Sequence, residues 1–336
     1  MATKIKKLAG SQIEISATIS ANDLSAYRVQ AIKNLGEEVK IDGFRKGKIP
    51  EQVLVDKLGE MTVLYEMAEL AIGDAYPKII EDEKIDAIGR PEVKITKIEK
   101  DKALEFTITT AVLPEVKVGD YVSIAKAEMK KDLDIKEVTD EENEKVIAEI
   151  LKQQTHTHDD GEEHVPELND EFVKSLGNFE NVEDFKKKVK ENINKEKEFR
   201  ALEKRRLDIA EKILETAEID IPRIMVEHEL SRSEAQFKDD ISRLGVKVED
   251  YMKRLNKTME DLRKEWEEGA TKKAKLQLVL NEITKKEKLT PAKEDVEKEV
   301  AMILEHYKNA DPIQARVYAE TVLTNDKVFA FLESQK

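Results

Sequence analysis

The sequence contains no cysteine, so disulfide bridges and metal sites built on thiolates are excluded. It also lacks any apolar run of about eighteen residues, the length that a membrane-spanning helix requires. The first residues are basic, but no apolar segment follows them, so a secretion signal is not expected. These absences predict a cytoplasmic protein with no membrane partner.

Aromatic residues are scarce as well, at 5% of the chain, whereas charged residues make up 39%. Together with a mean hydropathy of −0.58, this composition indicates long amphipathic helices with solvated faces rather than one aromatic-rich core. Hydrophobic residues, at 40%, are still numerous enough to bury a core, so disorder throughout the chain is not expected. The length of 336 residues allows two or three domains.

Positive charge is in the minority, and the net charge of −14 argues against a general nucleic-acid-binding protein. The distribution is uneven, because residues 1–48 hold nine Lys and Arg against five Asp and Glu. A basic start on an acidic remainder would let one end of the molecule approach RNA while the rest is repelled. No DNA partner is expected.

The first third of the chain mixes strand and helix patterns. Ile13, Ile15, Ala17 and Ile19 alternate with polar residues, which is typical of a half-buried strand. We therefore predict one α+β domain over residues 1–115. Its expected elements are a strand at 13–19, helices at 22–35, 50–58 and 61–81, and strands at 93–98 and 104–113.

The rest of the chain is predicted to be helical. Residues 116–165 are expected to form an extended linker strand, a linker helix at 140–154 and a polar loop. Residues 166–336 are expected to form an α-helical domain with projecting hairpins and no strand. Its expected helices run from Val182 past Leu214 and over residues 222–244, 258–286, 291–308 and 314–333.

The most informative segment is a basic loop between two of the expected helices. Glycine allows positive φ, and Pro50 suits the first turn of the following helix. We expect an exposed tip that docks on a negatively charged partner, although a solvated, merely cationic connection is the alternative. The predicted docking residues are Gly43, Phe44, Arg45, Lys46, Gly47, Lys48 and Pro50.

The pattern Gly-Phe-Arg-x-Gly-Lys-x-Pro at 43–50 resembles the ribosome-binding signature of the trigger factor family of bacterial chaperones. The element order over residues 12–83 is similar to the family's N-terminal domain, and segments 165–172 and 218–222 also resemble it. The resemblance implies an α+β protein. In this fold, a ribosome-binding N-terminal domain and a linker precede an elongated all-α chaperone domain with helical arms.

The function that this resemblance implies is ATP-independent binding of nascent polypeptides at the ribosomal exit tunnel, where misfolding is delayed. Phe44, Arg45 and Lys46 would contact an exit-tunnel protein and rRNA, since arginine forks onto phosphates. The resemblance further implies a homodimer away from the ribosome. No cofactor is implied.

One departure from the family pattern affects the expected activity. Members usually insert an FKBP-like prolyl isomerase domain after the linker helix, but here only the eleven residues 155–165 occupy that place. Eleven residues cannot form a twisted sheet around an aromatic pocket. We therefore predict that the protein is not an enzyme.

Two further groups of residues are weaker candidates. Methionine side chains adapt to varied partners, so some could meet unfolded chains, although each is also explained as core. Histidines beside carboxylates could bind Zn²⁺ or Ni²⁺, but a flexible polar linker is the favoured interpretation. The methionines are Met225, Met252, Met259 and Met302, and the histidines are His156, His158 and His164.

Motifs of nucleophilic or nucleotide-dependent enzymes are absent from the sequence. His228 and His306 stand alone within amphipathic helices, where a catalytic role is not expected. Three alternatives to the tethered chaperone remain open. They are a helical adaptor or holdase whose basic loop meets another anionic partner, a residual prolyl isomerase, and a metal-dependent role of the histidine segment.

Overall fold

The computed structural model of the chain describes residues 2–42, 44–45, 47–154, 156–157, 163–164 and 166–335. The chain forms two compact units, and each combines two segments that are far apart in the sequence. The first unit comprises Met1–Lys117 and Glu218–Leu278, and the second comprises Val118–Ala217 and Val279–Lys336.

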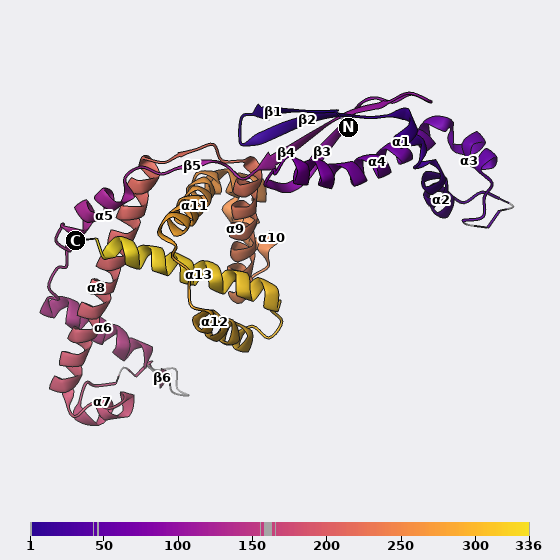
Figure 1. Cartoon of the computed structure of the whole chain (residues 1–336). Helices are drawn as coiled ribbons and strands as arrows, with labels where there is room; N and C mark the ends of the chain where they lie inside the picture. The colour runs from indigo at the N-terminus through magenta and orange to yellow at the C-terminus, as the bar shows by residue number, and fades with distance from the viewer. Residues whose placement is uncertain are drawn as a thin grey trace. The chain divides into compact units, whose positions relative to one another are not determined.

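The first unit contains a four-stranded antiparallel sheet in the order β1-β2-β4-β3 (Figure 1). Alternate residues of β2 and β4 are buried, among them Ile15 and Ile108, which are paired across the two strands. This alternation confirms the strands expected at 13–19 and 104–113. The strands are β1 (Ala2–Leu8), β2 (Gln12–Ile19), β3 (Ala87–Lys97) and β4 (Leu104–Val112).

Four helices share one hydrophobic core with this sheet. The longest helix, α4, runs along the sheet in Figure 1 and buries Val63, Met67 and Ala71. The single helix expected at 22–35 is in fact two helices, because a turn at residues 26–27 separates them. The four helices are α1 (Ala21–Ser25), α2 (Arg28–Glu38), α3 (Glu51–Leu58) and α4 (Glu60–Asp82).

The second segment of the first unit begins with a short strand, β8 (Glu218–Ile219), which pairs with β5 (Val116–Lys117). This strand corrects the expectation that no strand follows residue 169. Beside it, the Ser11 amide donates a 2.9 Å hydrogen bond to Asp220 Oδ2. The segment continues with α9 (Arg223–Arg243), α10 (Val248–Leu255) and most of α11 (Met259–Glu287).

The second unit is built around α8, a helix of 34 residues. The first half of α8 packs with α6 and α7 around Phe185 and Val189. Lys212, in its second half, is paired with the buried Glu128 of α5. The helices are α5 (Tyr121–Met129), α6 (Asp140–Gln153), α7 (Asp170–Leu176), α8 (Val182–Glu215), α12 (Lys293–His306) and α13 (Pro312–Glu333).

The helix α5 occupies a segment that was expected to be an extended linker. Asp120 caps it by accepting a 3.0 Å hydrogen bond from the Ser123 amide, and Tyr121 and Ala125 are buried. The Tyr121 hydroxyl donates a 2.6 Å hydrogen bond to Glu287 near the end of α11. Burial and this hydrogen bond raise the pKa of Tyr121 to about 12. The sequence favours a linker here because two helical turns are too short to show a clear helical period.

The predicted fold class is correct, since a small α+β region is followed by a long helical region. None of the helices in the described part of the chain is long and apolar enough to cross a membrane.

Candidate docking loop and apolar surfaces

The candidate docking loop connects α2 to α3 in the first unit (Figure 1). Two of its predicted residues, Gly43 and Lys46, lie outside the described residues. In the described part, the Gly47 amide donates a 2.9 Å hydrogen bond to the carbonyl oxygen of Gly36 in α2. The Lys48 amide donates a 3.0 Å hydrogen bond to the Arg45 carbonyl. The loop is therefore tied to the end of α2 and turned on itself.

Both ends of the loop are held by the core. Ile49 is buried, and Ile41 packs partly against the same cluster. Gly47 adopts φ +73°, a backbone conformation that residues with a side chain rarely adopt. The expected positive φ is therefore confirmed at this glycine, and the turn depends on it.

The charged and aromatic side chains in the described part of the loop are exposed. Phe44 is 42% exposed, and Arg45 and Lys48 are exposed as well. In the described part of residues 1–117, the cations that form ion pairs are Arg28, Lys100, Lys102 and Lys117. Arg45 and Lys48 are thus available to an external anion.

Arg28 links the helices on either side of the loop by hydrogen bonds. Its sequence position does not predict this role. Its guanidinium donates hydrogen bonds of 2.7 and 3.1 Å to the two carboxylate oxygens of Glu60 at the start of α4. It also donates one of 2.8 Å to Glu51 at the start of α3. Hydrogen bonding to Arg28 holds the pKa of Glu60 below its usual range, against a smaller opposing effect of burial.

The four methionines proposed to meet unfolded chains belong to different units. Met225, Met252 and Met259 are half-buried and belong to the first unit, whereas Met302 is 52% exposed on α12 of the second. Met252 lies on α10, a strongly amphipathic helix in which no residue is buried. Leu244, which caps the end of α9, and Leu255, the last residue of α10, are exposed as well.

A second apolar surface, which the sequence analysis misses, lies where α12 joins α13. We call it the hairpin tip; its exposed residues are Met302, Tyr307, Ile313, Val317 and Tyr318. In this part of α13 the small residues Ala315 and Ala319 are buried and the large ones face solvent. The sequence of α13 does show apolar residues on all sides of the helix. That pattern alone does not say which face packs against the rest of the protein and which faces solvent.

The histidine candidates lie only partly within the described residues. His156 and His164 are paired in backbone register between β6 (His156–Thr157) and β7 (Glu163–His164), and His158 lies outside the described residues. No cluster of three metal-ligating side chains occurs in the described parts of the chain. His228 is exposed on α9, and His306 is exposed at the end of α12.

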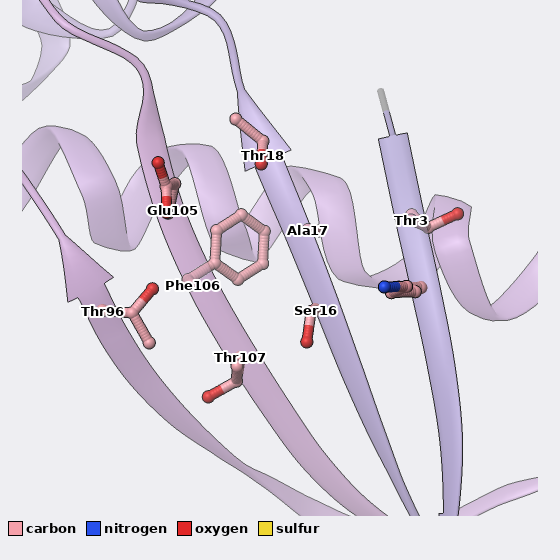
Figure 2. Close-up of a pocket in the computed structure, with 9 residues that line it drawn as sticks. Thr3, Ser16, Ala17, Thr18, Thr96, Glu105, Phe106 and Thr107 are labelled. Carbon is pink, nitrogen blue, oxygen red and sulfur yellow. The ribbon is translucent and has the colours of Figure 1, made fainter.

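Two open hollows lie on the first unit. The larger, of about 510 Å³, is lined mainly by hydroxyl groups and by Lys4 and Glu105, with Phe106 behind them (Figure 2). The smaller, of about 410 Å³, lies beside Ser11 and Asp220. Neither hollow is lined by a histidine.

An α+β region with an exposed cationic loop is followed by a helical region with uncovered apolar surfaces, an arrangement typical of a protein-binding chaperone. The comparisons with known proteins agree. The family model described as bacterial trigger factor protein matches residues 1–150, and the model of its C-terminus matches residues 181–336. The chain belongs to the trigger factor family.

Individual relatives match almost end to end. The trigger factor of Staphylococcus carnosus is 23% identical over 96% of this chain and 92% of the relative. That of Halalkalibacterium halodurans is 25% identical over 100% of this chain and 97% of the relative. That of Bacillus subtilis is 25% identical over 91% and 92%.

One solved structure has the same fold. It comes from work on promiscuous substrate recognition in the folding and assembly activities of the trigger factor chaperone. It matches with a TM-score of 0.55 and 17% identity, over 100% of both chains. Identity at this level supports the fold alone.

The comparisons fit the absence of a domain between the two matched regions. The two family models leave residues 151–180 unmatched. The alignments with the relatives from S. carnosus and H. halodurans extend over 410 and 420 positions, more than the 336 residues of this chain. Those relatives therefore carry residues that have no counterpart here.

Proposed function

We propose that this chain is an ATP-independent chaperone that docks on the ribosome through the loop at 43–50 and holds emerging polypeptides. The observation that carries the proposal is the loop itself. It is tied to α2 by Gly47 and presents Phe44, Arg45 and Lys48 without ion-pair partners in the described chain. An arginine fork and lysine charges suit RNA phosphates, and the neighbouring aromatic ring suits an apolar niche on a protein.

Unfolded polypeptides, the clients of such a chaperone, would bind at two uncovered apolar surfaces. One is formed around α10 by Leu244, Met252 and Leu255, and the other is the hairpin tip. Apolar surfaces of this kind on a monomeric protein mark sites of protein contact. Many weak contacts would hold an unfolded segment until folding buries its own apolar residues and it is released. Binding, without any covalent step, is the proposed mechanism in the cytoplasm.

Prolyl isomerisation is not part of the proposed function. The family models match the N- and C-terminal regions, and the short unmatched segment between them offers too few residues for an isomerase domain. The second candidate function is a holdase that never meets ribosomes and uses the loop on another anionic partner. The same exposed cations support that alternative, so a direct test with ribosomes separates the two.

Co-sedimentation with ribosomes is that test. We expect the unaltered chain to pellet with ribosomes at low salt and the triple variant Phe44→Ala/Arg45→Ala/Lys46→Ala to remain in the supernatant. The matched control is Val93→Ala/Lys94→Ala/Lys97→Ala, which removes an exposed apolar residue and two cations from the edge strand β3. The control is expected to pellet normally. If the unaltered chain stays in solution at low salt, the ribosomal assignment fails and the untethered holdase replaces it.

A further inference from the structure

The docking loop leaves part of the basic start of the chain unexplained. Of the nine Lys and Arg in residues 1–48, Lys4, Lys6 and Lys7 lie on β1 and not in the loop. All three are exposed, and none belongs to the ion-paired cations of the described part of residues 1–117. β1 is therefore a second basic element with no assigned partner.

The two edges of the sheet differ in how readily they could accept another strand. β3 carries Pro91 and two irregularities, between Ile88 and Glu92 and between Ile95 and Lys97. Proline and bulges of this kind block further pairing. β1 pairs regularly with β2 over all seven of its residues, and its outer edge has no partner strand in the described sheet. Figure 2 shows the strand that carries Thr3 as the outermost of the sheet.

The two faces of β1 have different chemistry. Ile5 is in register with Ile15 and Ile108, which are fully buried on the helix-covered side, yet Ile5 itself is 39% exposed. Lys4 and Lys6 point to the opposite, open face, because side chains alternate along a strand. A strand added beside β1 would therefore meet the apolar row of Ile5 on one face, where Lys7 also lies, and Lys4 and Lys6 on the other face.

The free edge of β1, its apolar row and its lysines together limit which partners could bind there. A second copy of β1 is disfavoured, because antiparallel pairing centred on Ile5 would set Lys4 opposite Lys6 of the other copy. RNA could neutralise the lysines, but it offers neither a strand backbone nor an apolar residue for Ile5. We propose that the outer edge of β1 binds an extended polypeptide segment in which acidic and apolar residues alternate. Main-chain hydrogen bonds would hold the segment, and the lysines would select its charge.

Binding of short labelled peptides to the full chain, without ribosomes, tests this directly. The probe is a seven-residue peptide, matching the length of β1, in which Glu alternates with Val. It is compared by fluorescence anisotropy with a peptide in which Lys replaces Glu. We expect the Glu peptide to bind and the Lys peptide to bind at least about tenfold more weakly. In the variant Lys4→Glu/Lys6→Glu this preference is expected to reverse, whereas Lys94→Glu/Lys97→Glu on β3 keeps the original preference.

Two N-methylated forms of the Glu peptide test the strand geometry. One is methylated at the odd residues and the other at the even residues, so that each blocks one edge of the peptide. An added strand bonds through one edge only, so one form is expected to lose binding and the other to keep it. Equal binding, or equal loss, by the two forms would overturn the proposal. An oligouridine that displaces the Glu peptide from the unaltered chain as effectively as unlabelled peptide would overturn it as well, in favour of a general polyanion site.

Discussion

At the scale of single residues, Gly47 sets the shape of the docking loop. Its φ of +73° would be strained in any other residue, and its amide bond to Gly36 ties the loop to α2. We predict that Gly47→Ala keeps every charge of the loop yet weakens ribosome binding about fivefold, because alanine in this conformation costs about 1 kcal/mol. The control is Gly73→Ala in α4, where a methyl group meets no neighbour and should stabilise the helix by about 0.5–1 kcal/mol. Unchanged binding by Gly47→Ala would mean that charge alone, and not loop shape, determines docking.

Arg28 offers a second test at the residue scale, because one side chain joins α2 to the starts of α3 and α4. Arg28→Met is predicted to destabilise this region by about 1–2 kcal/mol, since it leaves the half-buried Glu60 without its two-pronged partner. Amide hydrogen exchange in α2 and α3 should accelerate by about five- to thirtyfold at neutral pH. Arg90→Met, which removes an exposed arginine of β3, should change exchange in α2 and α3 very little.

The effect of Arg28→Met should also depend on pH. Because the folded pKa of Glu60 lies below its unfolded value of about 4.3, the stabilisation is complete above that value. It is lost as the pH falls through the lower, folded pKa, where Glu60 is protonated in both states. Exchange rates of the two proteins should therefore approach one another as the pH falls from about 4.3 through the lower, folded pKa of Glu60. A difference that persists there would assign the effect to packing of the arginine stem.

At the scale of elements, the sequence predicts best where one face of a strand or helix is clearly buried. β2 and β4 are predicted because their alternate residues enter the core. β1 escapes prediction because it is an edge strand whose lysines break the alternation. In the docking loop, the glycine and the exposed cations are readable from the sequence. The contact that holds the neighbouring helices together is not readable from the sequence, because Arg28 acts through Glu60, a partner 32 residues away.

The helix α13 is the clearest case in which sequence alone does not decide, and it yields a prediction at this scale. Ile313 and Val317 face solvent, so serine at both positions should change stability by less than about 0.5 kcal/mol. If the hairpin tip meets clients, Ile313→Ser/Val317→Ser should weaken suppression of aggregation of a denatured client severalfold. Gln314→Ser/Arg316→Ser, which removes exposed polar residues from the same turns, should not. Equal activity of both variants would exclude this face of α13 from client contact.

At the scale of the whole molecule, charge is divided between a small basic region and a much larger acidic remainder. The net charge of −14 opposes any broad contact with RNA, so favourable electrostatic contact is confined to a few cations. The proposed docking through such a small patch should be reversible. The affinity should also fall with salt concentration, and the slope of that fall gives the number of phosphates contacted.

If Arg45, Lys46 and Lys48 each neutralise one phosphate, log affinity should fall with log salt concentration at a slope of about −2.7. Between about 50 and 200 mM salt, affinity for ribosomes would then drop about fortyfold. The variant Arg45→Ala/Lys46→Ala should reduce the slope to about −0.9, because only one cation of the loop remains. Phe44→Ala should lower the affinity at every salt concentration and leave the slope unchanged, since it removes an uncharged contact. Dissociation constants measured by fluorescence anisotropy over this range check both slopes. A steep slope in Arg45→Ala/Lys46→Ala would place the main phosphate contacts outside the loop.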